Sequence, residues 1–447
     1  MPDNTEDPKP GVFSRTLGAF QALRPRSSTA PRPVPEVGIP AMLGQLGAAL
    51  LSSSQATNDV EDTLNLLAEH YGRGDLRVFV LPTLVLIEDP GNTTSQTSLF
   101  PVKGEALRLD QVDAVERLVR HAIEESTPPD DVVARLTEIR ASHARFGALL
   151  TVFGYTLLTV GFGMVLNPTV TALPVYVVLG AIVGPIVLFG SRVATLSLIL
   201  PVVTAFSVTL LISLLVRPLV HDDVLRLVAP ALVSFLPGLT LTIAAVELTS
   251  GQMMAGASRL VYGIARLGLL AFGVYAGISI AGEPPAPTTA PTQLGAWAPW
   301  VGIALVSLGY YLFSAAPRRS LVWILYALLV AYAAQLLGDA LVGPEMSGLI
   351  GAMIVIPAVM LAGHLKSAPA TAVMLTCAYW LLVPGAMGFI GLSEAASGTS
   401  GATDTILRTF GSLTAIAIGM LLGGGLSHDF TVASRGWKQA RANPRRA

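Results

Sequence analysis

One stretch of this chain limits its fold more than any other feature. Residues 146–430 contain only 18 Asp, Glu, Lys and Arg side chains, whereas residues 1–145 contain 34 in about half the length. The whole chain is 52% hydrophobic and 13% charged, about half the charge of an ordinary soluble domain. Its net charge of -1 argues against a basic nucleic-acid binder. The sequence therefore predicts a polytopic α-helical membrane protein rather than a soluble enzyme or a disordered chain.

The apolar region divides into about ten segments, each close to the roughly 20 residues that a helix needs to cross the hydrocarbon layer. We place these segments at 146–166, 169–189, 193–216, 228–249, 259–281, 296–316, 320–337, 345–363, 369–391 and 405–426. Positive side chains fall in alternate loops, on the side of both chain ends: Arg192, Arg259, Arg318, Arg319 and Lys366. The positive-inside rule then places both termini in the cytoplasm.

A motif occurs twice at a constant offset of 147 residues. FLPGLTLTIAAVELTSG (235–251) and LVPGAMGFIGLSEAASG (382–398) both fit P-G-x8-E-x2-S-G. Each copy lies in the fourth of five apolar segments. Because five is odd, the second half must enter the membrane in the opposite orientation. The sequence thus predicts two inverted five-helix repeats, an architecture typical of secondary transporters.

The Pro-Gly pairs of this motif are candidates for a substrate site. Proline removes a backbone donor and glycine permits unusual dihedral angles, so both can break a helix. Exposed backbone inside a membrane is tolerated where it lines a watery cavity. We therefore expect substrate binding or gating by the motif residues and nearby hydroxyls, namely Pro237, Gly238, Thr240, Thr242, Pro384 and Gly385. The alternative is a pair of kinked packing helices.

Ionisable side chains within apolar segments are costly and often functional. Glu247 and Glu394, the motif acids, are candidates for proton coupling, and Arg266 is a possible ion-pair partner of Glu247. The alternative is that both acids anchor helix ends and that Arg266 extends to the surface. The single cysteine, Cys377, and the scattered histidines predict no metal site and no cofactor.

The remaining regions complete the expected organisation. We expect a disordered tail at 1–37 and a small cytoplasmic α/β domain at 38–142, followed by the first membrane repeat at 143–281. An external proline-rich linker at 282–295 leads to the second repeat at 296–426, and a basic cytoplasmic tail occupies 427–447. In the α/β domain, helical spacing at 40–53, 56–71 and 109–125 flanks strand-like segments at 77–88 and 98–103.

Three segments resemble the threonine/serine exporter family in its fused form, which carries both five-helix units in one chain. They are ALLSSSQATNDVEDTLNLLAEHYG (49–72), FLPGLTLTIAAVELTSGQMMAGASRLVYG (235–263) and VPGAMGF (383–389). This resemblance implies export of threonine and serine driven by the proton gradient. Many family members carry Asp where Glu247 stands and a polar residue where Ile243 stands.

Taken together, these features predict a secondary active exporter of L-threonine and L-serine in the plasma membrane, and not an enzyme. Its expected partners are the substrate, protons and the lipid bilayer, with no nucleic acid. One alternative is an exporter or passive channel for another small polar metabolite. Another is a membrane-tethered hydrolase that uses Ser52–Ser54, Glu61 and His70.

Overall fold

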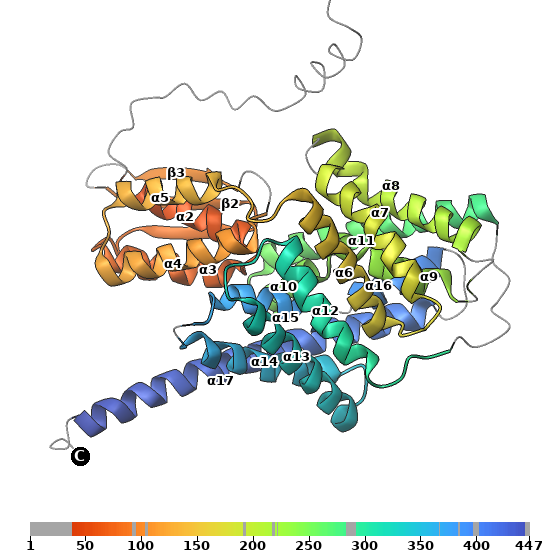
Figure 1. Cartoon of the computed structure of the whole chain (residues 1–447). Coiled ribbons are helices and arrows are strands. Elements are labelled where there is room, and N and C mark those ends of the chain that lie inside the picture. Colours follow the sequence, from red (N-terminus) through yellow and green to blue (C-terminus); the bar gives the residue numbers. More distant parts are fainter. Residues whose placement is uncertain are drawn as a thin grey trace, which may run out of the picture.

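The computed structural model describes residues 38–442, apart from 92–94, 103–105, 191–193, 217–219, 221, 283–291, 366, 383–384 and 397–401. The predicted tail at 1–37, most of the predicted linker at 282–295 and Pro384 lie outside the described residues. Figure 1 shows a mixed N-terminal unit, in red and orange, beside a larger bundle of helices. We use the term N-terminal unit for residues 38–142 and the term bundle for the helices from residue 148 onward.

The N-terminal unit contains four helices and one small sheet, as expected of an α/β fold. Its elements are α2 (Ile39–Ser52), α3 (Thr57–His70), β1 (Arg77–Leu81), β2 (Leu84–Asp89), β3 (Gln96–Pro101), α4 (Leu109–Glu125) and α5 (Pro129–Ala141). The three strands are antiparallel in the order β1-β2-β3. The proline within the predicted strand at 77–88 is the point where β1 ends and the chain turns into β2.

Alternation along the strands builds the core of the N-terminal unit. Val78 and Val80 of β1 are buried, as are Val85 and Ile87 of β2. Since strand side chains alternate between the two faces, these four valine and isoleucine residues share one face. Helices α2 and α3 pack on the sheet, and a leucine-rich core joins them to it.

The bundle consists of apolar helices in two successive sets. The first set is α6 (Ala148–Leu166), α7 (Leu173–Gly190), α8 (Ala194–Leu211), the short π-helix η1 (Ile212–Val216), α9 (Val224–Ala231), the 3-10 turn η2 (Val233–Phe235), α10 (Gly238–Thr249) and α11 (Met253–Ala281). The second set is α12 (Ala298–Phe313), α13 (Leu321–Val342), α14 (Ser347–Gly363), α15 (Thr371–Leu382), α16 (Gly385–Ala396) and α17 (Ala402–Ala442).

By length and composition, six of the described helices could cross a membrane, and a bent pair of shorter helices raises that number to seven. This supports a polytopic helical membrane protein. It does not confirm the count of ten, although every one of the ten predicted segments is helical over most of its length. The difference arises because α12, α14 and α15 have only 16, 17 and 12 residues, fewer than the roughly 20 that a full crossing needs.

The two sets of helices have matching neighbours. Within each set the first helix packs on the second and the third packs on the last, as α6 on α7 and α8 on α11 correspond to α12 on α13 and α14 on α17. Between the sets, α10 packs on α17 and α16 packs on α11. The helices that begin at the two motif glycines, α10 and α16, therefore each pack on both α11 and α17.

Glycines bring the first helices of the two sets into close contact. A Cβ atom at Gly161 of α6 would lie 2.7 Å from the carbonyl oxygen of Gly302 in α12. Seven residues away on each helix, a Cβ atom at Gly309 would lie 2.7 Å from the carbonyl oxygen of Gly154. Small residues at such crossings let two backbones approach directly, as in other membrane helix pairs.

Candidate functional site

The chain is sharply bent just before the first copy of the motif. Helix α9 and the segment Val233–Thr249 meet at an angle of 70°, and Pro237 immediately precedes α10, which starts at Gly238. The hydroxyl of Tyr155 donates to the Ala231 carbonyl at 2.8 Å and lies 3.0 Å from the Ser234 hydroxyl. Tyr155 is fully buried, so it satisfies a backbone acceptor that the break leaves without a helical partner.

Tyr155→Phe is expected to destabilise the protein by about 1–3 kcal/mol, because it leaves the buried Ala231 carbonyl without a donor. The ring and its edge contact with Phe313 would remain. Denaturant unfolding of the purified protein in detergent measures the effect. Tyr275→Phe is the matched control, since Tyr275 on α11 is 45% exposed; an equal loss in both variants would contradict this role for Tyr155.

The other predicted motif residues occupy contrasting positions. Thr242 is fully buried and its hydroxyl has no hydrogen-bond partner within the described residues, whereas Thr240 is half-buried. In the second copy, α16 begins at Gly385 and has the same length, 12 residues, as α10. Glu394 lies near the end of α16 and is half-buried. Helices α10 and α16 contact each other, which brings the two motif copies together.

Glu247 joins the bundle to the N-terminal unit. Its side chain is fully buried, and its Oε1 accepts a hydrogen bond of 2.9 Å from the backbone amide of Thr57. Thr57 is the first residue of α3, so the carboxylate lies at the positive end of that helix. The second oxygen, Oε2, lies 3.1 Å from Nε of Arg259, whose guanidinium also donates to the Gln55 carbonyl.

The predicted pairing of Glu247 with Arg266 was therefore wrong. Arg259, at the start of α11, takes that position, and Arg266 is half-buried two turns further along the helix. The chain reverses direction between α10 and α11 at Gly251, which has a φ of +86°. This tight turn returns the first turns of α11, and not its middle, to the end of α10.

A second contact, in which the carboxylate belongs to the N-terminal unit and the backbone amide to the bundle, joins that unit to the second half of the bundle. Asp113 of α4 accepts a hydrogen bond of 2.7 Å from the Ala370 amide, directly before α15, and pairs with Arg117 at 2.9 Å. Arg145 donates to the Ala316 carbonyl at 3.0 Å, beyond the end of α12. Each half of the bundle thus contacts the N-terminal unit through a buried carboxylate, Glu247 for the first half and Asp113 for the second. Arg145 is exposed and lies between that unit and α6.

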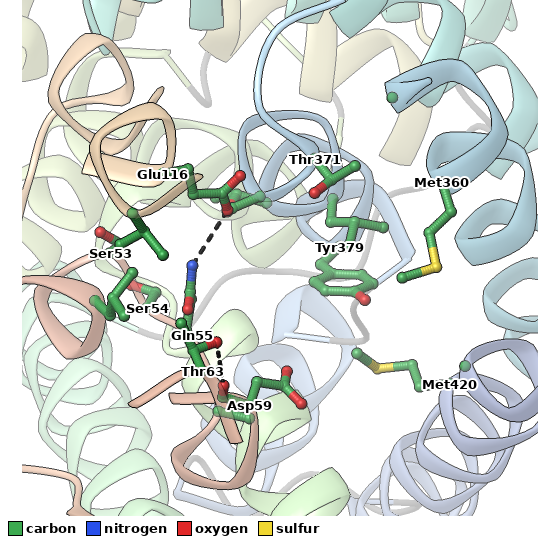
Figure 2. A pocket seen from close by; sticks show the side chains of 18 of the residues that line it. Ser53, Ser54, Gln55, Asp59, Thr63, Glu116, Met360, Thr371, Tyr379 and Met420 are labelled. Carbon is green, nitrogen blue, oxygen red and sulfur yellow. Dashed lines mark hydrogen bonds between the residues drawn. The ribbon is translucent and has the colours of Figure 1, made fainter. Parts of the chain in front are cut away.

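A cavity of about 1260 Å³ lies between these contacts. The N-terminal unit forms one wall with α2, α3 and α4, and helices α10, α14, α15 and α17 form the other. Figure 2 shows Gln55, Asp59 and Glu116 from the first wall together with Tyr379, Met360 and Met420 from the second. The contribution of α10 comes from the i, i+4, i+7 face of Leu239, Ile243 and Val246 and does not include Thr240 or Thr242.

Two carboxyl groups, Asp59 and Glu116, line the cavity together with Arg120 and His364. Enclosure by protein raises the pKa of Asp59 to about 6, and the neighbouring Asp62 and Glu247 carboxylates raise it further. Burial likewise raises the pKa of Glu116 to about 7, although the Ala372 amide and the Arg120 charge oppose that shift. The Asp59 side chain is exposed and lines the cavity, so the surrounding protein reduces its hydration without covering it.

Sequence reasoning missed both acids. Each lies on a helix of the N-terminal unit, where polar side chains indicate a solvated face, and only the packing of α3 and α4 against the bundle encloses them. Burial of this kind combined with a cavity is typical of functional sites. Within the described residues, no group of three or more His, Cys, Asp and Glu side chains could hold a metal ion.

The residues of the hydrolase alternative do not come together. His70 lies at the last turn of α3, beside the Ser126 hydroxyl at 2.8 Å. Ser52 and Ser53 precede α3 and bond to carbonyls of their own helix. A helix of 14 residues separates the two groups by roughly 20 Å, so they form no nucleophile and base pair.

Comparison with known proteins identifies a family. A family model described as "Putative threonine/serine exporter" matches residues 41–281, more than half of the 447 residues. The matched region covers most of the N-terminal unit and the complete first set of bundle helices. No curated protein and no solved structure matches the chain.

Proposed function

The chain belongs to the threonine/serine exporter family, and from this premise we propose that it exports small hydroxylated amino acids, L-threonine and L-serine, across the plasma membrane by secondary active transport. The observation that carries the proposal is the cavity between the N-terminal unit and α10, α14, α15 and α17. It combines a few charged groups with apolar walls, as small-molecule sites do. It also adjoins α10, the helix that follows the sharp bend.

We further propose that the bundle consists of two inverted five-helix repeats, with both termini in the cytoplasm. The matching helix neighbours of the two sets and the equal lengths of α10 and α16 support this arrangement. Under this repeat, each helix that lines the cavity has a counterpart in the other set. The counterparts of α10, α14, α15 and α17 are α16, α8, α9 and α11. Apolar residues of these four helices pack in one core, among them Phe389, Val228 and Leu270.

One group of four helices lines a cavity, whereas the equivalent group packs in a core. This difference supports an alternating-access cycle. The cavity beside the N-terminal unit corresponds to a state open to the cytoplasm, and the packed counterpart corresponds to a closed outer path. Opening α8, α9, α11 and α16 while closing the present cavity would carry a solute across the membrane. In this cycle Pro237 and Gly238 permit movement of α10, and we assign the same role to Pro384 and Gly385 in the second copy of the motif. Thr242 supplies a hydroxyl that has no hydrogen-bond partner among the described residues.

Proton coupling is the remaining part of the proposal. Of the two motif acids, Glu247 is already bonded to the Thr57 amide and faces Arg259, so we assign to it the anchoring of the N-terminal unit. Glu394 occupies the equivalent place in the second copy, and we assign proton exchange among the motif acids to it. The acids of the cavity, Asp59 and Glu116, are further candidates.

Vesicles loaded with radiolabelled threonine test the function. When the outside is acidified, we expect vesicles that contain the protein to release threonine at least tenfold faster than loaded vesicles without protein. The reason is that inward proton movement drives export. A protonophore should reduce this rate to that of a symmetric pH. A rate of threonine release that the protonophore does not change would indicate a passive channel. Release no faster than from vesicles without protein would refute threonine export.

A further inference from the structure

We infer that the N-terminal unit is part of the substrate site, and that Asp59 and Glu116 bind the ammonium group of an amino acid in the cavity. This inference deepens the proposed function and rests on it for the direction of transport, but it concerns binding and can be tested separately. It assigns a recognition role to a unit whose position would otherwise indicate only assembly or gating.

The two acids face the cavity from different helices. Asp59 lies in the first turn of α3, and Glu116 lies in the middle of α4, where its Oε1 accepts a hydrogen bond of 3.2 Å from the Gln55 side chain. Figure 2 shows both carboxyl groups on the same side of the cavity, with Gln55 between them. A single ammonium group has three donors and can therefore bond to carboxylates on two elements.

The opposite wall offers partners for the rest of a hydroxylated amino acid. The Tyr379 hydroxyl lines the cavity and has no hydrogen-bond partner within the described part of the chain. Thr371 and Thr376 add two hydroxyls from the same helix. On the wall of the N-terminal unit, Arg120 adds a positive charge one turn beyond Glu116. Arg120 is suited to the substrate carboxylate, since guanidinium and carboxylate groups form paired hydrogen bonds.

A proton and an ammonium group would compete for these carboxyls. The titratable groups near Asp59 are Asp62, Glu247 and, from the opposite wall, Tyr379, and those near Glu116 are Arg120 and Asp113. His364 also lines the cavity. With pKa values of about 6 and about 7, both acids gain negative charge as the pH rises through this range. Affinity for an ammonium group should therefore rise between pH 5.5 and 8, by about tenfold or more, and protonation should release the substrate.

A cysteine reporter tests binding without transport. Thr63 lies one turn after Asp59 and lines the cavity, and the natural Cys377 is buried. In a Thr63→Cys variant of the full chain, we expect L-threonine to slow alkylation by a maleimide. 3-Hydroxybutyrate, which lacks the ammonium group, should not slow it. Adding Asp59→Asn or Glu116→Gln should weaken the protection by threonine about tenfold or more, the usual cost of losing a charged hydrogen bond.

Asp62→Asn is the matched control, because Asp62 is exposed on the same helix and does not line the cavity; it should keep the protection. Equal protection by threonine and 3-hydroxybutyrate, unchanged protection in both cavity variants, or no protection at all would overturn the inference, even if vesicles export threonine. Protection that requires Asp59 and Glu116 in a protein that exports no threonine would support the site and refute the proposed function instead.

Discussion

Glu247→Gln is expected to lower the free energy of unfolding by about 3–5 kcal/mol, because it leaves the guanidinium of Arg259 buried without a counter-charge. The glutamine carbonyl can still accept the Thr57 amide hydrogen, so the loss reports the ion pair rather than the hydrogen bond. Arg259 is only 13% exposed and Glu247 is not exposed at all. Limited proteolysis should also show faster release of the N-terminal unit from the bundle.

Glu345→Gln is the control for that experiment. Glu345 and Arg408 form an ion pair of 2.6 Å, shorter than that of Glu247, but both side chains are about half exposed. Exposed pairs contribute little to stability, so this variant should unfold close to the wild type. If the two variants lose equal stability, burial is not the reason for the effect of Glu247.

The Glu247→Gln variant also distinguishes a Glu247 that anchors the N-terminal unit from a Glu247 that carries protons. We expect Arg259→Gln, added to Glu247→Gln, to restore part of the stability and part of the threonine efflux, because the uncompensated charge is removed. A proton-carrying Glu247 would give another result: efflux in Glu247→Gln would lose its dependence on external pH, and the second substitution would not restore it. Glu394→Gln provides the comparison, since we expect that variant to lose proton-driven efflux.

Gly161→Leu is expected to abolish the folded protein. A Cβ atom at this position would meet the Gly302 carbonyl oxygen and the Val306 amide nitrogen, both at 2.7 Å. Backbone atoms cannot turn aside as a side chain can, so α6 and α12 would have to separate. Inserting one or two methylene groups into a packed core already costs about 1–3 kcal/mol, and a leucine adds four carbon atoms. The fraction of monodisperse protein after detergent extraction measures the result.

The substitution Gly268→Leu separates this effect from the general cost of leucine for glycine. Gly268 lies inside α11, and a Cβ atom there meets nothing within 4 Å. We expect this variant to be extracted and to unfold like the wild type. A folded Gly161→Leu protein, or equal loss in both variants, would show that α6 and α12 do not pack as closely as the structure places them.

Local features of the fold were accessible from the sequence. The elements of the N-terminal unit follow from apolar periodicity, and the break before α10 follows from Pro237 and Gly238, whose effects on a helix act within one turn. Segment positions in the bundle were also predictable, since apolar runs mark them directly. The number of crossings was not, because α12, α14 and α15 are shorter than hydropathy alone suggests.

Tertiary features were not accessible in the same way. Glu247 stood out as a charge in an apolar segment, but its partner depends on the turn at Gly251, which brings Arg259, predicted to be a loop charge, beside it. Asp59 and Glu116 carried no signal, because the periodicity of α3 and α4 describes their packing within the N-terminal unit and not their packing on the bundle. The polar face of a helix can be solvated or enclosed, and its sequence is the same in both cases.

The contacts of α10 and α11 with helices of the second half have a consequence for how the protein is made. A ribosome finishes α10 and α11 before it has translated α16 and α17, the helices on which they pack. Until translation ends, the first half must reside in the bilayer with those faces covered by lipid or by the insertion machinery. Biogenesis therefore has a waiting stage, and its length is set by the time needed to synthesise the second half.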